Sequence, residues 1–192
     1  MNFLQIWLDK PLPAEYKANM LGVLDKLEPG DTYTCISDFP LFSDSRVKWV
    51  IAGVIQTYID RDYNGLMAKV ILNNPDLSPV WKSDILRMYW LSKYPDTLYL
   101  DTDGTLVTKP ILTKISFGTL DMTDGSVRGD YYAIYNLNNC TFFLDCMSRF
   151  NKHITIHPDQ AANYFFTMIN VILSSNYIDW YQIGQDIFEH GV

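Results

Sequence analysis

Two aspartates separated by a single residue, Asp101 and Asp103, follow the apolar residues Tyr99 and Leu100. The segment Thr97–Asp103 is expected to be a strand, and residues i and i+2 of a strand point to the same face. Both carboxylates are therefore expected at the C-terminal end of this strand, where two like charges so close favour a shared cation. The spacing predicts that both carboxylates reach one cation.

A second charged pair, Asp84 and Arg87, lies within the expected helix Pro79–Tyr94. This helix is apolar on nearly every side, which is typical of a buried helix. Residues three positions apart are neighbours on a helix surface, and buried charges need partners. Either the two side chains pair with each other, or both face a cleft and hydrogen-bond a polar ligand.

The first forty residues predict a β-α-β unit that would support these groups. Phe3–Leu8 is a short apolar run typical of a buried strand. Pro13 opens a helix that extends to about Leu27, and Asp31–Phe39 has the β-branched and aromatic content of a second strand. This order of elements is typical of an α/β sheet with parallel pairing.

The rest of the chain predicts further elements of both kinds. Helices are expected at Asp44–Tyr58, Gly65–Leu72, Thr141–Phe150 and Pro158–Leu173, and strands at Ile111–Leu120 and Asp130–Leu137. The segment Tyr177–Phe188 is expected to pack back on the sheet. His153 and His157 flank a short strand-like piece and are expected to be structural or surface residues.

Composition limits the function classes. With 192 residues, the chain is expected to form a single domain with one core. A formal net charge of −7 counts against nonspecific binding to the nucleic-acid backbone, which needs clustered Lys and Arg. The sequence shows neither a signal-peptide pattern nor an apolar run long enough to span a bilayer. We therefore expect a cytoplasmic location (the host cytoplasm if the protein is viral) and no membrane partner.

Several motifs occur together in the order of a known enzyme family. They are the segment SDILR (Ser83–Arg87), the segment YLDTD (Tyr99–Asp103), Ile6-Trp7 and Leu12-Pro13. This arrangement resembles the Asp-x-Asp glycosyltransferase family that includes yeast-type initiating mannosyltransferases and the catalytic domains of clostridial glucosylating toxins. The chain departs from the family at Pro95-Asp96-Thr97, where the family has Gly-Gly, and glycine allows backbone geometry that other residues resist.

The resemblance implies a fold and a division of the chain. The fold would be that of A-type glycosyltransferases, Rossmann-like, with a mixed, mostly parallel sheet flanked by helices. Residues 1–110 would bind a nucleotide-sugar donor, such as a UDP- or GDP-sugar. Residues 111–192 would supply the acceptor region and the C-terminal helices. The acceptor would be a glycan, a protein or a modified nucleobase, and the reaction would be retaining.

The resemblance also implies roles for individual residues. Trp7 would stack on the base, and Asp84 and Arg87 would hold the donor sugar and the diphosphate. The expected donor contacts are Ile6, Trp7, Asp84, Arg87, Tyr99, Asp101 and Thr102. The expected ligands of Mn²⁺ or Mg²⁺ are Asp101, Asp103 and His190, and the expected catalytic residues are Asp84, Arg87 and Asp103. Weaker candidates for acceptor contacts are Asn136, Asn138, Asn139 and Asp159.

Two alternatives remain open from the sequence. The segment LYLDTDGTLV (Leu98–Val107) resembles the first motif of haloacid-dehalogenase-type phosphatases, in which Asp101 would be the nucleophile and Asp103 the general acid/base, with Mg²⁺ between them. That family has this strand near the start of its domain and a later acidic pair on a strand, and neither feature is found here. The second alternative is an inactive binding module on a transferase fold, which the missing Gly-Gly would support.

Overall fold

The computed structural model describes residues 1–8, 10–63, 72–121, 127–138, 140–156 and 179–190. The helices are α1 (Ala14–Leu24), α2 (Ala52–Asp62), α3 (Pro79–Lys93) and α4 (Cys140–Ile156). The strands are β1 (Asn2–Trp7), β2 (Thr32–Ser37), β3 (Val47–Ile51), β4 (Thr97–Leu100), β5 (Gly104–Leu106), β6 (Ser116–Asp121), β7 (Val127–Tyr135), β8 (Tyr181–Gln182) and β9 (Phe188–His190). None of these helices is long and apolar enough to cross a membrane.

Within the described residues, seven strands form one sheet in the order β3-β2-β1-β4-β7-β6-β8. The pairs β1/β2, β1/β4, β2/β3 and β6/β8 are parallel, and the pairs β4/β7 and β6/β7 are antiparallel. The predicted mixed, mostly parallel α/β sheet is confirmed. Because β1, β2 and β4 run in the same direction, Trp7 and the residues that follow Leu100 lie at the same edge of the sheet.

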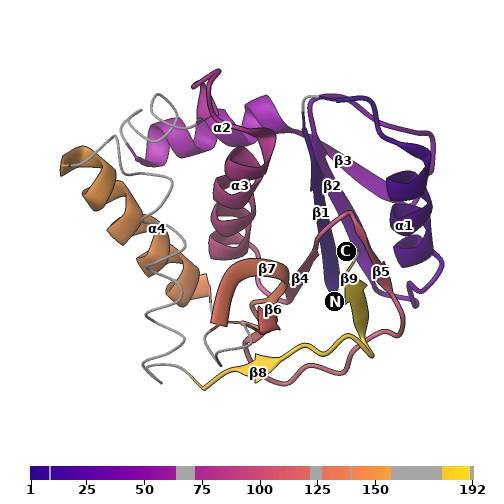
Figure 1. Cartoon of the computed structure of the whole chain (residues 1–192). Helices are drawn as coiled ribbons and strands as arrows, with labels where there is room; N and C mark the ends of the chain where they lie inside the picture. Colours follow the sequence, from indigo (N-terminus) through magenta and orange to yellow (C-terminus); the bar gives the residue numbers. More distant parts are fainter. Residues whose placement is uncertain (9, 64–71, 122–126, 139, 157–178, 191–192) are drawn as a thin grey trace.

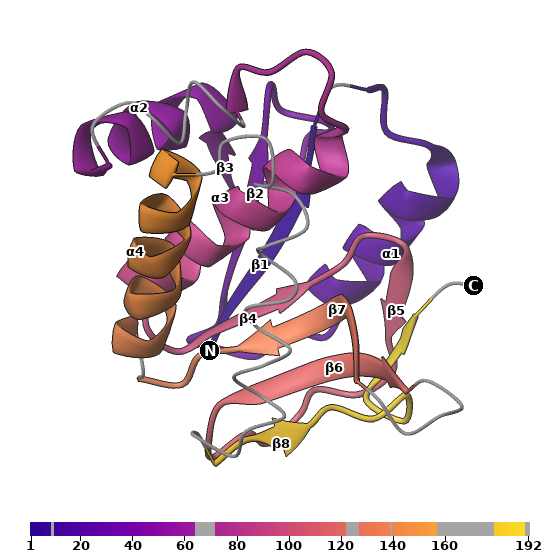
Figure 2. The same cartoon turned by 60° about the vertical axis from the view of Figure 1, so that its left-hand side comes forward.

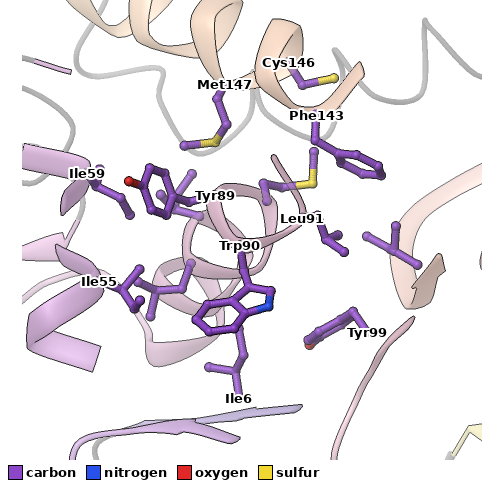
Figure 3. Packing of buried hydrophobic residues seen from close by; sticks show 14 of the residues in the cluster. Ile6, Ile55, Ile59, Tyr89, Trp90, Leu91, Tyr99, Phe143, Cys146 and Met147 are labelled. Carbon is purple, nitrogen blue, oxygen red and sulfur yellow. The ribbon is translucent and has the colours of Figure 1, made fainter. Parts of the chain in front are cut away.

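The sheet separates two apolar cores, and β1 contributes to both because alternate residues of a strand point to opposite faces. Leu4 and Ile6 pack with residues of α2, α3 and α4, whereas Phe3 packs with residues of α1. Figure 1 shows α2, α3 and α4 on one side of strands β1–β3 and α1 on the other, and Figure 2 shows the same arrangement after rotation. In the larger core, Trp90 of α3 lies against Ile6 (Figure 3).

A second, two-stranded sheet joins the last described strand to the middle of the chain. Strands β5 and β9 pair antiparallel, so that Gly104 lies opposite His190. No side chain fits at Gly104, because a Cβ there would lie 2.3 Å from Phe188 Cζ and 2.8 Å from the Glu189 carbonyl oxygen. The glycine that follows Asp103 thus lets β9 approach the two aspartates.

Replacing Gly104 by alanine is expected to separate β5 from β9 and to lower the free energy of unfolding by about 1–3 kcal/mol, as overpacking typically does. Urea denaturation measures this change. Gly22→Ala is the matched control, because a Cβ at Gly22 of α1 meets no atom within 4 Å. The control should gain about 0.5–1 kcal/mol, since alanine is favoured over glycine within a helix. Equal effects of the two substitutions would contradict the close packing at Gly104.

The turn before β4 contains a residue in the left-handed conformation that is not glycine. Asp96 has φ 51°, a backbone conformation that aspartate adopts more readily than most residues. Its amide donates to the Leu137 carbonyl oxygen, and its carboxylate accepts a hydrogen bond of 2.6 Å from the Tyr135 hydroxyl. Asp96 therefore supplies the conformation expected of glycine, and the Pro95-Asp96-Thr97 segment forms a defined turn.

The structure corrects several of the predicted elements, among them the strand Ile111–Leu120, which begins only at Ser116. The expected helix Asp44–Tyr58 is wrong in its first half, because the β-branched residues of Val47–Ile51 form strand β3 and the helix begins at Ala52. The strand-like piece after His153 is also wrong, since helix α4 continues to Ile156. The expected helix at 158–173, His157 and all of the expected helix Gly65–Leu72 except Leu72 lie outside the described residues.

Candidate metal and nucleotide site

The turn Asp101–Asp103 lies between β4 and β5, at the sheet edge where Trp7 ends β1. Strand β4 ends at Leu100, so the expectation that both aspartates belong to the strand is wrong. The Asp101 amide donates to the Tyr132 carbonyl oxygen at 2.8 Å, which fixes the start of the turn against β7. The turn, rather than a shared strand face, brings the two carboxylates together.

His190 approaches the same two carboxylates from β9. Its Nε2 lies 3.3 Å from Asp103 Oδ1 and 3.8 Å from Asp101 Oδ2. The imidazole also packs on the Tyr132 ring, with the ring centroids 5.4 Å apart. One ligand atom from each of Asp101, Asp103 and His190 lies within 4.8 Å of the others. The structure thus brings together the three residues that were predicted to bind a metal.

These three residues fit a divalent cation. Asp103 Oδ1 is inaccessible to solvent and accepts no hydrogen bond from any described residue. A buried polar atom left in this way destabilises a protein, and the cost is larger for a charged group. Carboxylate oxygens suit Mn²⁺ and Mg²⁺, and an imidazole nitrogen is a common ligand of divalent transition metals. A cation between them would satisfy Asp103 Oδ1 and offset the repulsion between the aspartates.

Tyr99 and Arg87 both lie against the Asp101 carboxylate. The Tyr99 hydroxyl donates to Asp101 Oδ1 at 2.5 Å, and Arg87 Nη1 lies 3.7 Å from the same oxygen. Burial raises the pKa of Asp101, the Asp103 charge raises it further, and Arg87, Tyr99 and His190 oppose this rise without cancelling it. Burial also raises the pKa of Tyr99 well above its ordinary value, so the hydroxyl keeps its proton and remains a donor.

Tyr99→Phe is expected to weaken Mn²⁺ binding about 10-fold, because the loss of a hydrogen bond to a ligand has effects of this size. The ring under the Arg87 guanidinium is kept. Tyr89→Phe is the matched control, since the hydroxyl of Tyr89 on α3 also donates to a carboxylate, that of Asp62 at the end of α2, at 2.8 Å. Both variants should lose about 1 kcal/mol of stability. Titration of Mn²⁺ by electron paramagnetic resonance should separate them, and equal Mn²⁺ affinities would refute the role of Tyr99.

Asp84 and Arg87 are both buried, with 3% and 4% of their surface exposed. They pair with each other at 2.6 Å between Asp84 Oδ1 and Arg87 Nη2. Arg87 also donates to the Tyr131 carbonyl oxygen at 2.9 Å, and its guanidinium lies 4.9 Å from the centroid of the Tyr99 ring. Neither residue lines the pocket described next. Their direct contact with a donor sugar stays a prediction.

A pocket of about 390 Å³ opens beside the aspartate turn. Its lining comes from the end of β1 and the following loop, from α1, from the start of α3 and from the turn after β4. The residues are Ile6, Trp7, Leu8, Lys10, Tyr16, Ser78, Pro79, Val80, Ser83, Tyr99, Asp101, Thr102 and Asp103. The expected donor contacts Ile6, Trp7, Tyr99, Asp101 and Thr102 are thus around one cavity.

Trp7 forms an aromatic wall of this pocket together with Tyr16. The two ring centroids are 5.0 Å apart, and Trp7 Nε1 donates to the Lys10 carbonyl oxygen at 2.8 Å. The indole is therefore fixed in place with its N–H already used. The place of Tyr16 in the pocket wall could not be read from the helical spacing of α1. Lys10 was missed as well, although it lies only three residues after Trp7.

Asn136 is a structural residue rather than an acceptor contact. It is fully buried, and its Nδ2 donates to the carbonyl oxygens of Leu91 and Tyr94 at the end of α3. Its Oδ1 accepts a hydrogen bond of 2.8 Å from the Thr97 amide. Asn136 therefore joins the end of α3 to the start of β4. Asn139 and Asp159 lie outside the described residues.

Comparisons with known proteins bear on the fold. No protein-family model and no curated protein sequence matches the chain. A solved structure described as "PaToxG Glycosyltransferase" is similar, with a TM-score of 0.56 and 16% sequence identity over 91% of this chain and 71% of that chain. At this identity the likeness establishes the fold, which is the mixed α/β fold of a glycosyltransferase.

Proposed function

We propose that this protein is a metal-dependent glycosyltransferase that transfers a sugar from a UDP- or GDP-sugar and acts in the cytoplasm. The observation that carries the proposal is the convergence of Asp101, Asp103 and His190 beside a pocket that has Trp7 in its wall. The fold shared with a known glycosyltransferase structure supports it. The region 1–110 would bind the donor and the region 111–192 the acceptor, within a single domain.

The residues would divide the work as follows. Asp101, Asp103 and His190 would hold Mn²⁺ or Mg²⁺, which when bound offsets the negative charge that develops on a departing diphosphate. Trp7 would stack on the base, because every base has a π-face. Tyr99 and Arg87 would hold the Asp101 carboxylate in place. Ile6 and Thr102 would complete the donor contacts.

Asp84 and Arg87 carry opposite charges that offset each other. Among the described residues, Lys10 is the only basic one in the lining of the pocket, so the negative charge of a bound diphosphate would be offset mainly by the metal. Of the expected catalytic residues, we propose that Asp103 acts as a ligand of the metal, that Arg87 positions Asp101, and that Asp84 holds Arg87 through their ion pair. Retention of configuration and an acceptor that is a glycan, a protein or a modified nucleobase complete the proposal.

The test is a thermal-shift panel with Mn²⁺ alone, nucleoside diphosphates alone and both together. A ligand at 100 times its Kd stabilises the folded state by about 2.7 kcal/mol, so a true donor should raise Tm clearly. We expect a rise that needs Mn²⁺ and one nucleotide together, and Mn²⁺-dependent release of the nucleoside diphosphate from the matching sugar nucleotide. The absence of a nucleotide response, combined with Mg²⁺-dependent hydrolysis of p-nitrophenyl phosphate, would favour the phosphatase instead.

A further inference from the structure

Two side-chain amides from separate elements hold successive carbonyl groups of the aspartate turn. Gln5 of β1 donates from Nε2 to the Asp101 carbonyl oxygen at 3.0 Å. Asn19 of α1 donates from Nδ2 to the Thr102 carbonyl oxygen at 3.1 Å. With the Asp101 amide bound to β7, the backbone of a three-residue turn is fixed at three points.

Each amide is oriented by a hydroxyl group. The Tyr33 hydroxyl donates to Gln5 Oε1 at 2.6 Å, and the Thr105 hydroxyl donates to Asn19 Oδ1 at 3.2 Å. An amide oxygen only accepts hydrogen bonds and an amide nitrogen only donates them. Because the hydroxyls contact the oxygens, the nitrogens are directed at the carbonyl groups of the turn.

The burial of Gln5 shows that this contact is specific. Gln5 is fully buried between the apolar residues Leu4 and Ile6 of β1, and Tyr33 is 1% exposed. A buried polar group destabilises a protein unless it is hydrogen-bonded. If packing alone mattered at this position, an apolar residue would serve equally well. Gln5 contacts instead the turn that carries Asp101. Asn19 contacts the same turn from α1, the helix that follows β1 in the sequence.

We propose that Gln5 and Asn19 are positioning residues that hold Asp101 and Asp103 close enough to share one cation. This inference rests on the metal site of the proposed function. Two carboxylates this close repel each other, and a free turn would relax by moving them apart. The two amides prevent this relaxation by holding the carbonyl groups of Asp101 and Thr102. They belong to the same two elements, β1 and α1, that supply Trp7 and Tyr16 to the pocket wall.

Asn19→Ala tests the proposal, with Asn2→Ala as the matched control. Asn2 lies on β1 and, like Asn19, donates from its side-chain amide to a backbone carbonyl oxygen, that of Pro95 at 3.2 Å. Pro95 precedes β4, whereas the aspartate turn follows β4. Mn²⁺ affinity is measured by electron paramagnetic resonance, and amide hydrogen exchange of residues 101–104 is measured without metal. We expect Asn19→Ala to bind Mn²⁺ about 10-fold more weakly, the size of effect seen for groups that orient metal ligands. It should also exchange faster in the turn, whereas Asn2→Ala should match the wild type in both.

A second variant tests Gln5 without leaving the buried Tyr33 hydroxyl group unsatisfied. Gln5→Leu combined with Tyr33→Phe removes both partners, which can be nearly neutral for stability. This double variant should show the same weaker Mn²⁺ binding and faster exchange. Wild-type Mn²⁺ affinity in both Asn19→Ala and the double variant would overturn the inference and leave the metal site standing. A wild-type protein that binds no Mn²⁺ would overturn the metal site and the inference together.

Discussion

Asp103→Asn is expected to weaken Mn²⁺ binding by at least about 100-fold, because groups that only orient a ligand already contribute about 10- to 100-fold. Asparagine keeps the size of the side chain and removes the charge of the Oδ1 atom that accepts no hydrogen bond from the described residues. Mn²⁺-dependent cleavage of a sugar nucleotide should fall with it. Isothermal titration with Mn²⁺ and the release of nucleoside diphosphate measure the two effects.

Glu189→Gln is the control for this substitution. Glu189 is an exposed residue of β9 next to His190, so the variant removes one negative charge near the site and leaves the three ligands intact. Its Mn²⁺ affinity should stay within about twofold of the wild type, since charges exposed to solvent are strongly screened. Equal losses in the two variants would mean that general negative charge, and not Asp103 as a ligand, attracts the cation.

Arg87→Met is expected to give the largest loss of stability, about 3–5 kcal/mol, as the removal of one partner of a buried ion pair typically does. The change leaves the Asp84 carboxylate, 3% exposed, without the guanidinium that lies 2.6 Å from it. It also removes the hydrogen bond to the Tyr131 carbonyl oxygen, which links α3 to β7. Urea denaturation followed by circular dichroism measures the loss.

The double variant Asp84→Leu/Arg87→Met separates the buried charge from the packing. Replacing a whole buried ion pair by apolar residues of similar volume is often neutral or stabilising. The double variant should therefore recover most of the stability that Arg87→Met loses, although it should remain impaired in Mn²⁺ binding because Arg87 no longer faces Asp101. A double variant as unstable as Arg87→Met would contradict this account of the pair.

The parts of the fold that follow from local pattern could be predicted from the sequence. The first strand, the helix after Pro13 and the second strand carry clear periodicity and end signals, and β1, α1 and β2 confirm them, although α1 ends at Leu24. Strand β3 was missed because the run Trp49–Ile55 is uniformly apolar. Such a run cannot be assigned to strand or helix by periodicity alone. Pairing with β2 makes residues 47–51 a strand, and this pairing depends on the arrangement of the whole sheet.

The same limit explains what was found and missed in the site. Asp101 and Asp103 stand out because two acidic residues follow an apolar segment. The turn that unites them was not predicted, since it depends on contacts with Gln5 and Asn19 from distant parts of the chain. Gln5 could have been singled out from the sequence, because a polar residue inside an apolar strand indicates a buried hydrogen bond. The pairing of Asp84 with Arg87 was one of two interpretations, and the structure shows this pair.

The most direct test of the account is a crystal structure of the protein with Mn²⁺ and UDP or GDP, with the metal located by its anomalous scattering. We predict one Mn²⁺ bound by Asp101, Asp103 and His190, at roughly 2.0–2.3 Å from their ligand atoms as is usual for such ligands. The diphosphate should contact the metal, and the base should stack on Trp7. Mn²⁺ bound elsewhere, or a nucleotide bound away from the pocket beside Trp7, would contradict the proposed site and with it the proposed function.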